Sequence, residues 1–286
     1  MKLICDSGST KSAWCLTDGT TPLHYSTQGI NPFQQTEEEI AAILHMELAT
    51  QLPDNINIKE VYFYGAGCTK EKSPIVAKAI RATIAPDAKI TVDSDLLGAA
   101  IALCGDEEGI VCILGTGSNA AFYDGKALHS CIPALGYILG DEGSGAYIGK
   151  RLIGDILKHR FSERIRNMFF GEMHETQASI IQKTYREPLA NRYLASISPF
   201  CARHREEEEI HEFLIDCFSQ FFERNIVPMT NELNLENCTV NCVGSIAYFY
   251  RNEIREVAKK YGFCLGTILR APIDGLIRTI SSRPNQ

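Results

Sequence analysis

The fold is decided by the stretch DSGSTK, from Asp6 to Lys11. It lies between the apolar runs 2–5 and 13–16, and Asp18-Gly19 closes the second run. Two apolar runs joined by a short polar segment predict a β-hairpin. Small residues in the turn let backbone N–H groups approach an anion, while hydroxyls and a lysine add donors, so this turn suits a phosphate group.

The same pattern recurs further along the chain. The turn GTGSN at 115–119 lies between the apolar runs 110–114 and 120–123, and Asp124-Gly125 closes the second run. A repeated hairpin predicts an internal duplication. A third loop of similar composition, GDEGSG at 140–145, follows. Neither the P-loop motif nor the Rossmann glycine motif is present, so those two nucleotide folds are excluded.

Strands and helices are predicted to alternate in the first half of the chain. Apolar spacing over 36–52 predicts a helix that begins with a capping box of Thr36 and Glu39. The other expected elements are strands at 61–64, 89–92, 239–243 and 268–270, helices at 73–84, 95–103, 246–260 and 274–280, and a mainly helical region from about 145 to 233. This order predicts an α/β fold with mixed sheets flanked by helices.

Length and composition bound the function. The chain has 286 residues, which favours two domains, and we expect these at 1–104 and 105–271, with the C-terminal helix at about 272–286 joining the first. Apolar residues make up 45% and charged residues 22%, which excludes a disordered chain or a coiled-coil rod. The net charge of −7 argues against binding to nucleic acid or anionic membranes, so we expect a small-molecule partner.

The sequence also predicts a cytoplasmic location. No apolar run reaches the length of a membrane span, and Asp6 interrupts the first apolar run too early for a secretory signal. The cysteines number 11, an odd count, and are scattered along the chain, which predicts reduced thiols rather than disulfides. Trp14 lies in an apolar strand of the first hairpin and is expected in the core.

The chain resembles the N-acetylglucosamine kinase branch of the BadF/BadG/BcrA/BcrD ATPase family, within the actin, hexokinase and Hsp70 superfamily. The resemblance runs nearly end to end and rests on DSGSTKS at 6–12, GINP at 29–32, DLLGAA at 95–100, LGTGSN at 114–119, GDEGSGAYIG at 140–149 and VGSIA at 243–247. It implies two ribonuclease-H-like (actin-like ATPase) domains with mixed sheets flanked by helices, and a cleft for ATP and a sugar between them. It also suggests a homodimer.

The resemblance implies a set of binding residues. It assigns Ser7, Gly8, Ser9, Thr10, Lys11, Thr116 and Gly117 to the ATP phosphates, and Gly244 and Ser245 to the nucleoside end of ATP. Asp6 would hold Mg²⁺ through water, because Mg²⁺ takes one or two carboxylates plus phosphate oxygens. The residues assigned to the sugar are Asn31, Asp95, Ser118, Asn119, Leu135, Gly136 and Asp141.

Asp95 is the candidate general base. It follows the predicted strand ITVDS at 90–94 and opens a helix, whose N-terminus is expected to favour the ionised carboxylate. There it could accept the proton of a sugar hydroxyl that attacks the γ-phosphate. On the residues alone, a role as the helix N-cap fits the position equally well; the resemblance favours the catalytic role. Asp93 is a weaker rival on the same side of the strand.

These assignments predict an ATP-dependent sugar kinase, with transfer to the 6-hydroxyl as the family default. N-acetylglucosamine, glucosamine, N-acetylmuramic acid and glucose all stay open as the substrate, because the segment 134–136 is less polar and aromatic than in some relatives. One rival is an ATPase activator of an iron–sulfur dehydratase or reductase, which needs thiolates. The other is a noncatalytic sugar-sensing protein that binds ATP and could dispense with Asp95.

Overall fold

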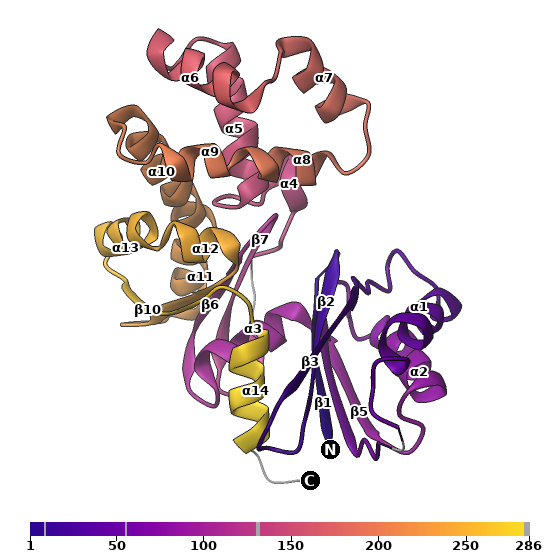
Figure 1. Ribbon diagram of the computed structural model, residues 1–286. Coiled ribbons are helices and arrows are strands. Elements are labelled where there is room, and N and C mark those ends of the chain that lie inside the picture. The colour runs from indigo at the N-terminus through magenta and orange to yellow at the C-terminus, as the bar shows by residue number, and fades with distance from the viewer. Residues whose placement is uncertain (9, 55, 130–131, 283–286) are drawn as a thin grey trace. The chain divides into compact units, whose positions relative to one another are not determined.

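The computed structural model describes residues 1–8, 10–54, 56–129 and 132–282. The chain forms two compact units. Figure 1 shows their helices and strands, coloured by residue number. Unit 1 comprises Met1–Glu107, Gly125–Leu128 and Ala271–Gln286, and unit 2 comprises Glu108–Asp124 and His129–Arg270.

The sheet of unit 1 has five strands in the order β3-β2-β1-β4-β5. These strands are β1 (Lys2–Ser7), β2 (Lys11–Thr17), β3 (Leu23–Gln28), β4 (Glu60–Gly65) and β5 (Lys89–Ser94). Strand β1 is antiparallel to β2 and parallel to β4, so the predicted first hairpin is confirmed. Strand β3 was not predicted, because it is an exposed, polar edge strand without an apolar alternation.

The helices of unit 1 come from the N-terminal part of the chain and from its last helix. They are α1 (Glu37–Ile43), the π-helical η1 (Leu44–Ala49), α2 (Ser73–Thr83), α3 (Asp95–Cys104) and α14 (Ile273–Ser282). The predicted capping box is confirmed at the start of α1. The C-terminal helix α14 contacts the first part of the chain: Lys2 Nζ donates to Ile280 O at 3.0 Å and Thr279 Oγ1 donates to Ile101 O at 3.2 Å.

Trp14 lies in the core of unit 1, as predicted. Its side chain is fully buried, and its ring centre lies 5.7 Å from that of Phe63. The indole Nε1 donates to Thr27 Oγ1 at 3.1 Å, which satisfies the one polar group of the ring. Trp14 therefore fixes β2 against β3 and β4 and is not a ligand contact.

The second sheet has the order β10-β9-β6-β7-β8. Its strands are β6 (Glu108–Leu114), β7 (Ser118–Asp124), β8 (Leu128–His129), β9 (Thr239–Val243) and β10 (Cys264–Leu269). Strand β6 is antiparallel to β7 and parallel to β9, the same relations that β1 has to β2 and β4. The two sheets thus share one strand order, which agrees with the predicted duplication.

Unit 2 carries most of the helices. They are α4 (Gly136–Leu139), α5 (Gly145–Leu157), α6 (Glu163–Met173), α7 (Gln177–Tyr185), α8 (Ala190–Ile197), α9 (Pro199–Arg203), α10 (Glu208–Phe221), the π-helical η2 (Phe222–Ile226), α11 (Val227–Leu233), α12 (Ser245–Phe249) and α13 (Arg251–Lys260). Helices α5 and α8 cross at Gly149, where a Cβ atom would lie 1.9 Å from Leu194 O. The glycine is therefore required for this close crossing.

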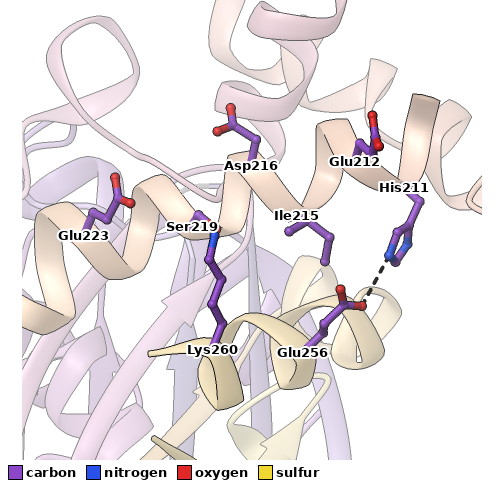
Figure 2. A pocket seen from close by; sticks show the side chains of 8 residues that line it. All are labelled: His211, Glu212, Ile215, Asp216, Ser219, Glu223, Glu256 and Lys260. Carbon is purple, nitrogen blue, oxygen red and sulfur yellow. Dashed lines mark ion pairs between the residues drawn. The ribbon is translucent and has the colours of Figure 1, made fainter. Parts of the chain in front are cut away.

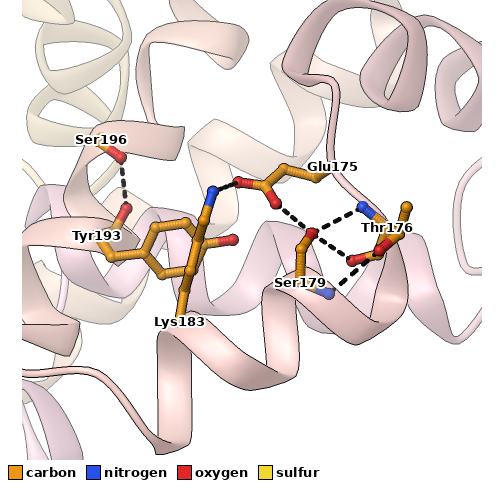
Figure 3. Close-up of polar contacts among 6 residues, drawn as sticks. All are labelled: Glu175, Thr176, Ser179, Lys183, Tyr193 and Ser196. Atoms are coloured by element: carbon orange, nitrogen blue, oxygen red, sulfur yellow. Dashed lines mark hydrogen bonds and ion pairs between the residues drawn. The ribbon is translucent and has the colours of Figure 1, made fainter.

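A polar cluster ties α7 to α8 (Figure 3). The Glu175 carboxylate, whose side chain is 6% exposed, accepts hydrogen bonds from Lys183 Nζ at 2.7 Å and from Ser179 Oγ. Lys183 Nζ also lies 5.4 Å from the ring centre of Tyr193 on α8. Burial opposes the ionisation of Glu175, but the hydrogen bonds from Lys183 and Ser179 outweigh it and lower the pKa of this carboxyl.

The described residues bear on membrane-spanning helices and on disulfides. None of the described helices is long and apolar enough to cross a membrane. No disulfide joins the ten cysteines in the described part of the chain, and Cys131 lies outside it.

Candidate active site

Two carboxylates lie at the carboxyl ends of parallel strands in unit 1. Asp6 is near the end of β1, and Asp95 is the first residue of α3, directly after β5. Asp6 is level with Tyr64 of β4, which is level with Asp93 of β5. Helix α3 lies close to β4 because Gly98 packs on Tyr64, where a Cβ atom would lie 2.5 Å from the tyrosine Cβ. This packing fixes Asp95 at the edge of the sheet.

Burial governs the protonation of both carboxylates. Burial, and next the charge of Asp95, raises the pKa of Asp6 to about 7. Burial also raises the pKa of Asp95, against the opposing effect of hydrogen bonds from the backbone N–H groups of Leu96 and Asp95 itself. The backbone N–H groups at the helix N-terminus favour the ionised form, as expected, but burial outweighs them and the net pKa of Asp95 is raised. A raised pKa brings a carboxylate nearer to the value that suits a general base.

Ser94, not Asp95, is the N-cap of α3. The Ser94 Oγ atom accepts a hydrogen bond from Leu97 N at 3.2 Å, and the Ser94 backbone is extended, as in other N-caps. Asp93 Oδ1 accepts from Ser94 N at 2.7 Å, so this carboxylate serves the turn before the helix. The N-cap interpretation of Asp95 is wrong, and the cap was misassigned by one residue.

The β1–β2 turn has fewer outward donors than the sequence suggested. The Gly8 N–H donates to Lys11 O at 3.0 Å and is thereby used inside the turn. Thr10 and Lys11 are exposed, and Ser9 lies outside the described residues. Among the described residues of the turn, Thr10 and Lys11 are therefore the most accessible to an anion.

The Ser7 side chain connects this turn to the loop that carries Asn31. Ser7 is fully buried, and its Oγ atom lies 2.7 Å from Ser12 Oγ. The same Oγ atom accepts from Ile30 N at 3.1 Å and donates to Ile30 O at 3.0 Å. Gly29 N donates to Thr10 O at 3.0 Å. The Ser7 hydroxyl is therefore a structural link, while its backbone carries the predicted phosphate contact.

Asn31 is held by a residue that the sequence analysis did not identify. Asn31 N donates to Gln35 Oε1 at 2.8 Å, and Gln35 Nε2 donates to Gly29 O at 3.1 Å. The Asn31 Oδ1 atom accepts from Phe33 N at 3.0 Å. The sequence shows only that Gln35 follows Asn31 by four residues. This spacing indicates a contact only once the loop conformation is known.

Three glycine-rich loops meet in unit 2. Gly145 N donates to Gly115 O at 2.8 Å, which joins the start of α5 to the β6–β7 turn. Gly244 has a φ of +123°, and a Cβ atom there would lie 2.2 Å from Leu114 O. The loops at 115–119, 140–145 and 244–245 therefore form one cluster, with Thr116 and Ser245 exposed.

Asp141 joins two of the predicted sugar contacts. Its Oδ1 atom accepts from Ser118 N at 3.3 Å, and a Cβ atom at Gly117 would lie 2.8 Å from its Oδ2 atom. The Asp141 backbone is left-handed, with φ of 57°. Burial raises the pKa of Asp141, partly against the hydrogen bond from Ser118. Asn119, the neighbour of Ser118, uses its Oδ1 atom to accept from Ala120 N at 2.9 Å.

The Leu135-Gly136 segment lies beside the Asp141 loop. Gly140 N donates to Gly136 O at 2.8 Å, and Lys150 Nζ on α5 donates to Tyr137 O at 2.7 Å. Leu135 is 54% exposed, so its side chain is accessible to a ligand. The structure thus groups the predicted residues by unit: Asp6, Ser7, Gly8, Thr10, Lys11, Asn31 and Asp95 in unit 1, and Thr116, Gly117, Ser118, Asn119, Leu135, Gly136, Asp141, Gly244 and Ser245 in unit 2.

A surface pocket of about 280 Å³ lies elsewhere in unit 2 (Figure 2). It lies between α10 and α13, and its walls include Glu212, Asp216, Glu223 and Glu256; the last of these pairs with His211 at 3.2 Å. Four carboxylates repel phosphate groups. None of the predicted site residues lines this pocket, and its four carboxylates outnumber Lys260, which disfavours it as a site for ATP.

The chain matches solved structures over nearly its whole length. A crystal structure of a candidate N-acetylglucosamine kinase from Porphyromonas gingivalis is 42% identical, with 99% of each chain covered and a TM-score of 0.91. The chain belongs to the N-acetylglucosamine kinase family. This agrees with the resemblance carried by the GTGSN and GDEGS segments.

More distant structures of the same fold accompany this family member. A candidate N-acetylglucosamine kinase from Chromobacterium violaceum is 15% identical, with 98% of each chain covered and a TM-score of 0.71. A ROK family glucokinase from Streptomyces griseus, crystallised with glucose and AMPPNP, is 13% identical, with 97% of each chain covered and a TM-score of 0.54. No protein-family model and no curated protein matches the sequence.

The structural matches over nearly the whole chain confirm the predicted actin-like ATPase fold.

Proposed function

We propose that this protein is an ATP-dependent kinase that phosphorylates a hydroxyl group, by family default the 6-hydroxyl, of N-acetylglucosamine or a related amino sugar. The observation that carries the proposal is the half-buried pair of Asp6 and Asp95 at the carboxyl ends of parallel strands. The 42% identity to a candidate N-acetylglucosamine kinase supports the same activity. ATP and a sugar are the two substrates.

Asp95 acts as the general base in this proposal. It accepts the proton of the attacking sugar hydroxyl while the hydroxyl oxygen bonds to the γ-phosphorus. The bond between that phosphorus and the oxygen bridging to the β-phosphate breaks, and ADP leaves. Burial of Asp95 supports the role, because its raised pKa makes the carboxylate a better proton acceptor. Transfer of this kind depends mainly on positioning and charge neutralisation.

The residues present fit a Mg²⁺ ion. Burial, and next the charge of Asp95, raises the pKa of the Asp6 carboxyl, and a nearby cation would stabilise its ionised form. Asp6 would hold the ion together with ATP oxygens, because no group of three or more His, Cys, Asp or Glu residues in the described part of the chain could hold a metal by itself. The bound ion would neutralise the charge of the phosphates.

We assign the remaining residues to ATP and sugar as follows. In unit 1, the Ser7 backbone, Thr10 and Lys11 contact phosphate, and Asn31 contacts the sugar. Gly8, whose N–H is used inside the turn, contributes by having no side chain to block the phosphate, and Ser9 lies outside the described residues. In unit 2, Thr116 and Gly117 contact phosphate, Gly244 and Ser245 contact the nucleoside, and Ser118, Asn119, Leu135, Gly136 and Asp141 contact the sugar. The hydrogen bond from Ser118 N to Asp141 supports a shared sugar site for these two residues.

The burial of the thiols disfavours the ATPase activator as an alternative. Burial raises the pKa of the Cys5 and Cys201 thiols well above the ordinary value, and that of Cys68 to about 12. Cluster ligation requires accessible thiolates, and these three buried thiols are poor candidates for it. An ATP-dependent kinase with reduced cysteines and a net charge of −7 is consistent with a cytoplasmic protein.

The test is an ADP-release assay on the purified protein with Mg²⁺-ATP and one sugar at a time. The panel is N-acetylglucosamine, glucosamine, N-acetylmuramic acid and glucose, with Asp95→Asn and Asp93→Asn as a matched pair of variants. We expect at least one sugar to stimulate ADP release, and only Asp95→Asn to abolish the stimulation. No stimulation by any sugar, or full activity of Asp95→Asn, overturns the proposal. The position of the phosphate in the product is read by NMR.

A further inference from the structure

An exposed aromatic ring lies directly beside Asn31. Phe33 is 62% exposed, although an exposed phenylalanine buries little apolar surface and gains little stability from folding. The ring is held from one side by Lys72, whose Nζ atom lies 5.6 Å from the ring centre. Phe33 is thus an oriented aromatic side chain that is open to solvent in a loop implicated in sugar binding.

Gly67 brings the Phe33 ring and the Asn31 amide together. A Cβ atom at Gly67 would lie 2.3 Å from Asn31 Oδ1 and 3.0 Å from Phe33 Cδ2, so both side chains lie against the same glycine. The Gly67 φ of +78° is also a conformation that other residues rarely adopt. A side chain at position 67 would push the ring and the amide away. The glycine therefore makes room for their side-by-side arrangement.

The donor end of the Asn31 amide is available to a ligand. Its Oδ1 atom is used by Phe33 N at 3.0 Å, whereas its Nδ2 group has no hydrogen-bond partner among the residues that the structure describes. The site thus offers an N–H donor next to the face of an aromatic ring. A pyranose has the complementary surface, because its hydroxyls lie at the ring edge and its carbon-bound hydrogens form an apolar face.

The same turn also approaches the candidate base. Gly67 belongs to the loop after β4, and the charge of Asp95 is felt at the Cys68 thiol, one residue further on. Asn31 and Phe33 therefore contact a loop that also carries Cys68, the residue affected by Asp95. The ring and the amide lie within reach of the part of unit 1 where the attacking hydroxyl would lose its proton.

We infer that Phe33 is a substrate-binding residue, whose ring contacts the apolar face of a pyranose while Asn31 Nδ2 donates to one of its hydroxyls. This inference rests on the proposed sugar kinase function and deepens it. Contact with the pyranose face does not depend on the N-acetyl group. The ring therefore contributes to the binding of N-acetylglucosamine and glucosamine alike.

The test compares Phe33→Ala with Tyr185→Ala, which removes an aromatic side chain that is 74% exposed on α7. We expect Phe33→Ala to raise the KM for each accepted sugar about 2- to 10-fold, the range for losing one aromatic contact, and to leave the KM for ATP and the melting temperature unchanged. Tyr185→Ala is expected to leave all of these unchanged. Equal sugar KM values for Phe33→Ala and the wild type, or a loss confined to N-acetylated sugars, overturn the inference.

A binding measurement separates this inference from the proposed function. In Phe33→Trp, sugar added without ATP is expected to change the emission of the new indole, while the buried Trp14 of the wild type gives no response. A wild type that no sugar stimulates contradicts the kinase proposal itself. A wild type that is active, combined with an unresponsive Phe33→Trp and an unimpaired Phe33→Ala, contradicts only the role of Phe33.

Discussion

The Ser7 hydroxyl forms two hydrogen bonds with the backbone of a single residue, Ile30, at 3.0 and 3.1 Å. Both residues are fully buried. One small side chain thus satisfies the N–H and C=O groups of a loop residue that water does not reach. Because Ser7 ends β1 and Ile30 precedes Asn31, this pair joins the β1–β2 turn to the loop that carries Asn31.

Replacing Ser7 is expected to disturb that loop. Ser7→Ala leaves the buried Ile30 N–H without a partner, so we expect the free energy of unfolding to fall by about 1–3 kcal/mol. The sugar KM should rise several-fold more than the ATP KM, because Asn31 loses its support. Urea denaturation and steady-state kinetics measure the two effects. Ser12→Ala is the control: it removes a hydroxyl from the same pair but keeps Ile30 bonded, and it should affect the sugar KM less. Equal effects of the two variants would contradict the proposed link.

Asp95→Asn is expected to reduce kcat and leave binding nearly intact. Loss of a general base lowers the rate by about 10²- to 10⁴-fold, while the amide preserves the shape of the side chain. The KM values for sugar and ATP should change by less than about threefold, since the base acts in the transition state. Asp93→Asn, which affects only the turn before α3, should retain most of the activity. A larger loss of kcat in Asp93→Asn would reverse the two assignments.

The stability of the protein is expected to fall as the pH rises from about 4 to about 7. The unfolded chain releases the Asp6 proton near pH 3.9, whereas in the folded protein the pKa is about 7. Between these values the folded state binds more protons, so deprotonation disfavours it, with a slope of up to about 1.4 kcal/mol per pH unit. Asp95 contributes in the same direction.

Asp6→Asn is the variant that isolates this effect. It removes one titrating carboxyl, so urea denaturation at several pH values should give a flatter profile and higher stability at pH 7 than the wild type. Asp54→Asn, on the exposed surface of unit 1, is the control and should keep the wild-type slope. If Asp6→Asn keeps the wild-type slope, Asp6 is not the group that titrates.

Gly244 is expected to tolerate no side chain. In Gly244→Ala the new Cβ atom would lie 2.2 Å from Leu114 O, and the φ of +123° is strained for alanine. We expect a loss of about 2 kcal/mol or more in stability and a raised KM for ATP. The control is Gly154→Ala within α5, where nothing lies within 4 Å of the new atom; alanine should stabilise that helix by about 0.5–1 kcal/mol. Thermal melts separate the two variants.

Lys183 is expected to stabilise unit 2 only while Glu175 is ionised. Lys183→Met leaves the buried Glu175 carboxylate without its ammonium partner, which should cost about 1–3 kcal/mol at pH 7. Because the pKa of Glu175 is lowered in the folded state, its contribution is present above about pH 4.5 and is lost as the pH falls. The stabilities of the wild type and Lys183→Met should therefore converge as the pH falls below about 4.5. A constant difference at all pH values would assign the loss to packing.

The elements that could be predicted are those with a clear apolar pattern in their own sequence. Helices α2 and α5 have apolar periodicity and strand β9 is an apolar run, so their positions were predicted closely. The polar edge strand β3 lacks such a pattern, because its pairing with β2 rather than its own side chains makes it a strand. The domain limits stay a prediction, which limited proteolysis can test.

The sequence by itself determined the duplicated hairpins, the glycine-rich loops, the family and the candidate Asp95. These depend on residue type and spacing, which are local and readable. Only the tertiary structure decided that Ser94 caps α3, that burial and not the helix N-terminus governs the pKa of Asp95, that Ser7 bonds to Ile30, and that Gly67 sets Phe33 beside Asn31. Each of these depends on burial or on contacts between segments distant in the chain, and a linear pattern does not encode them.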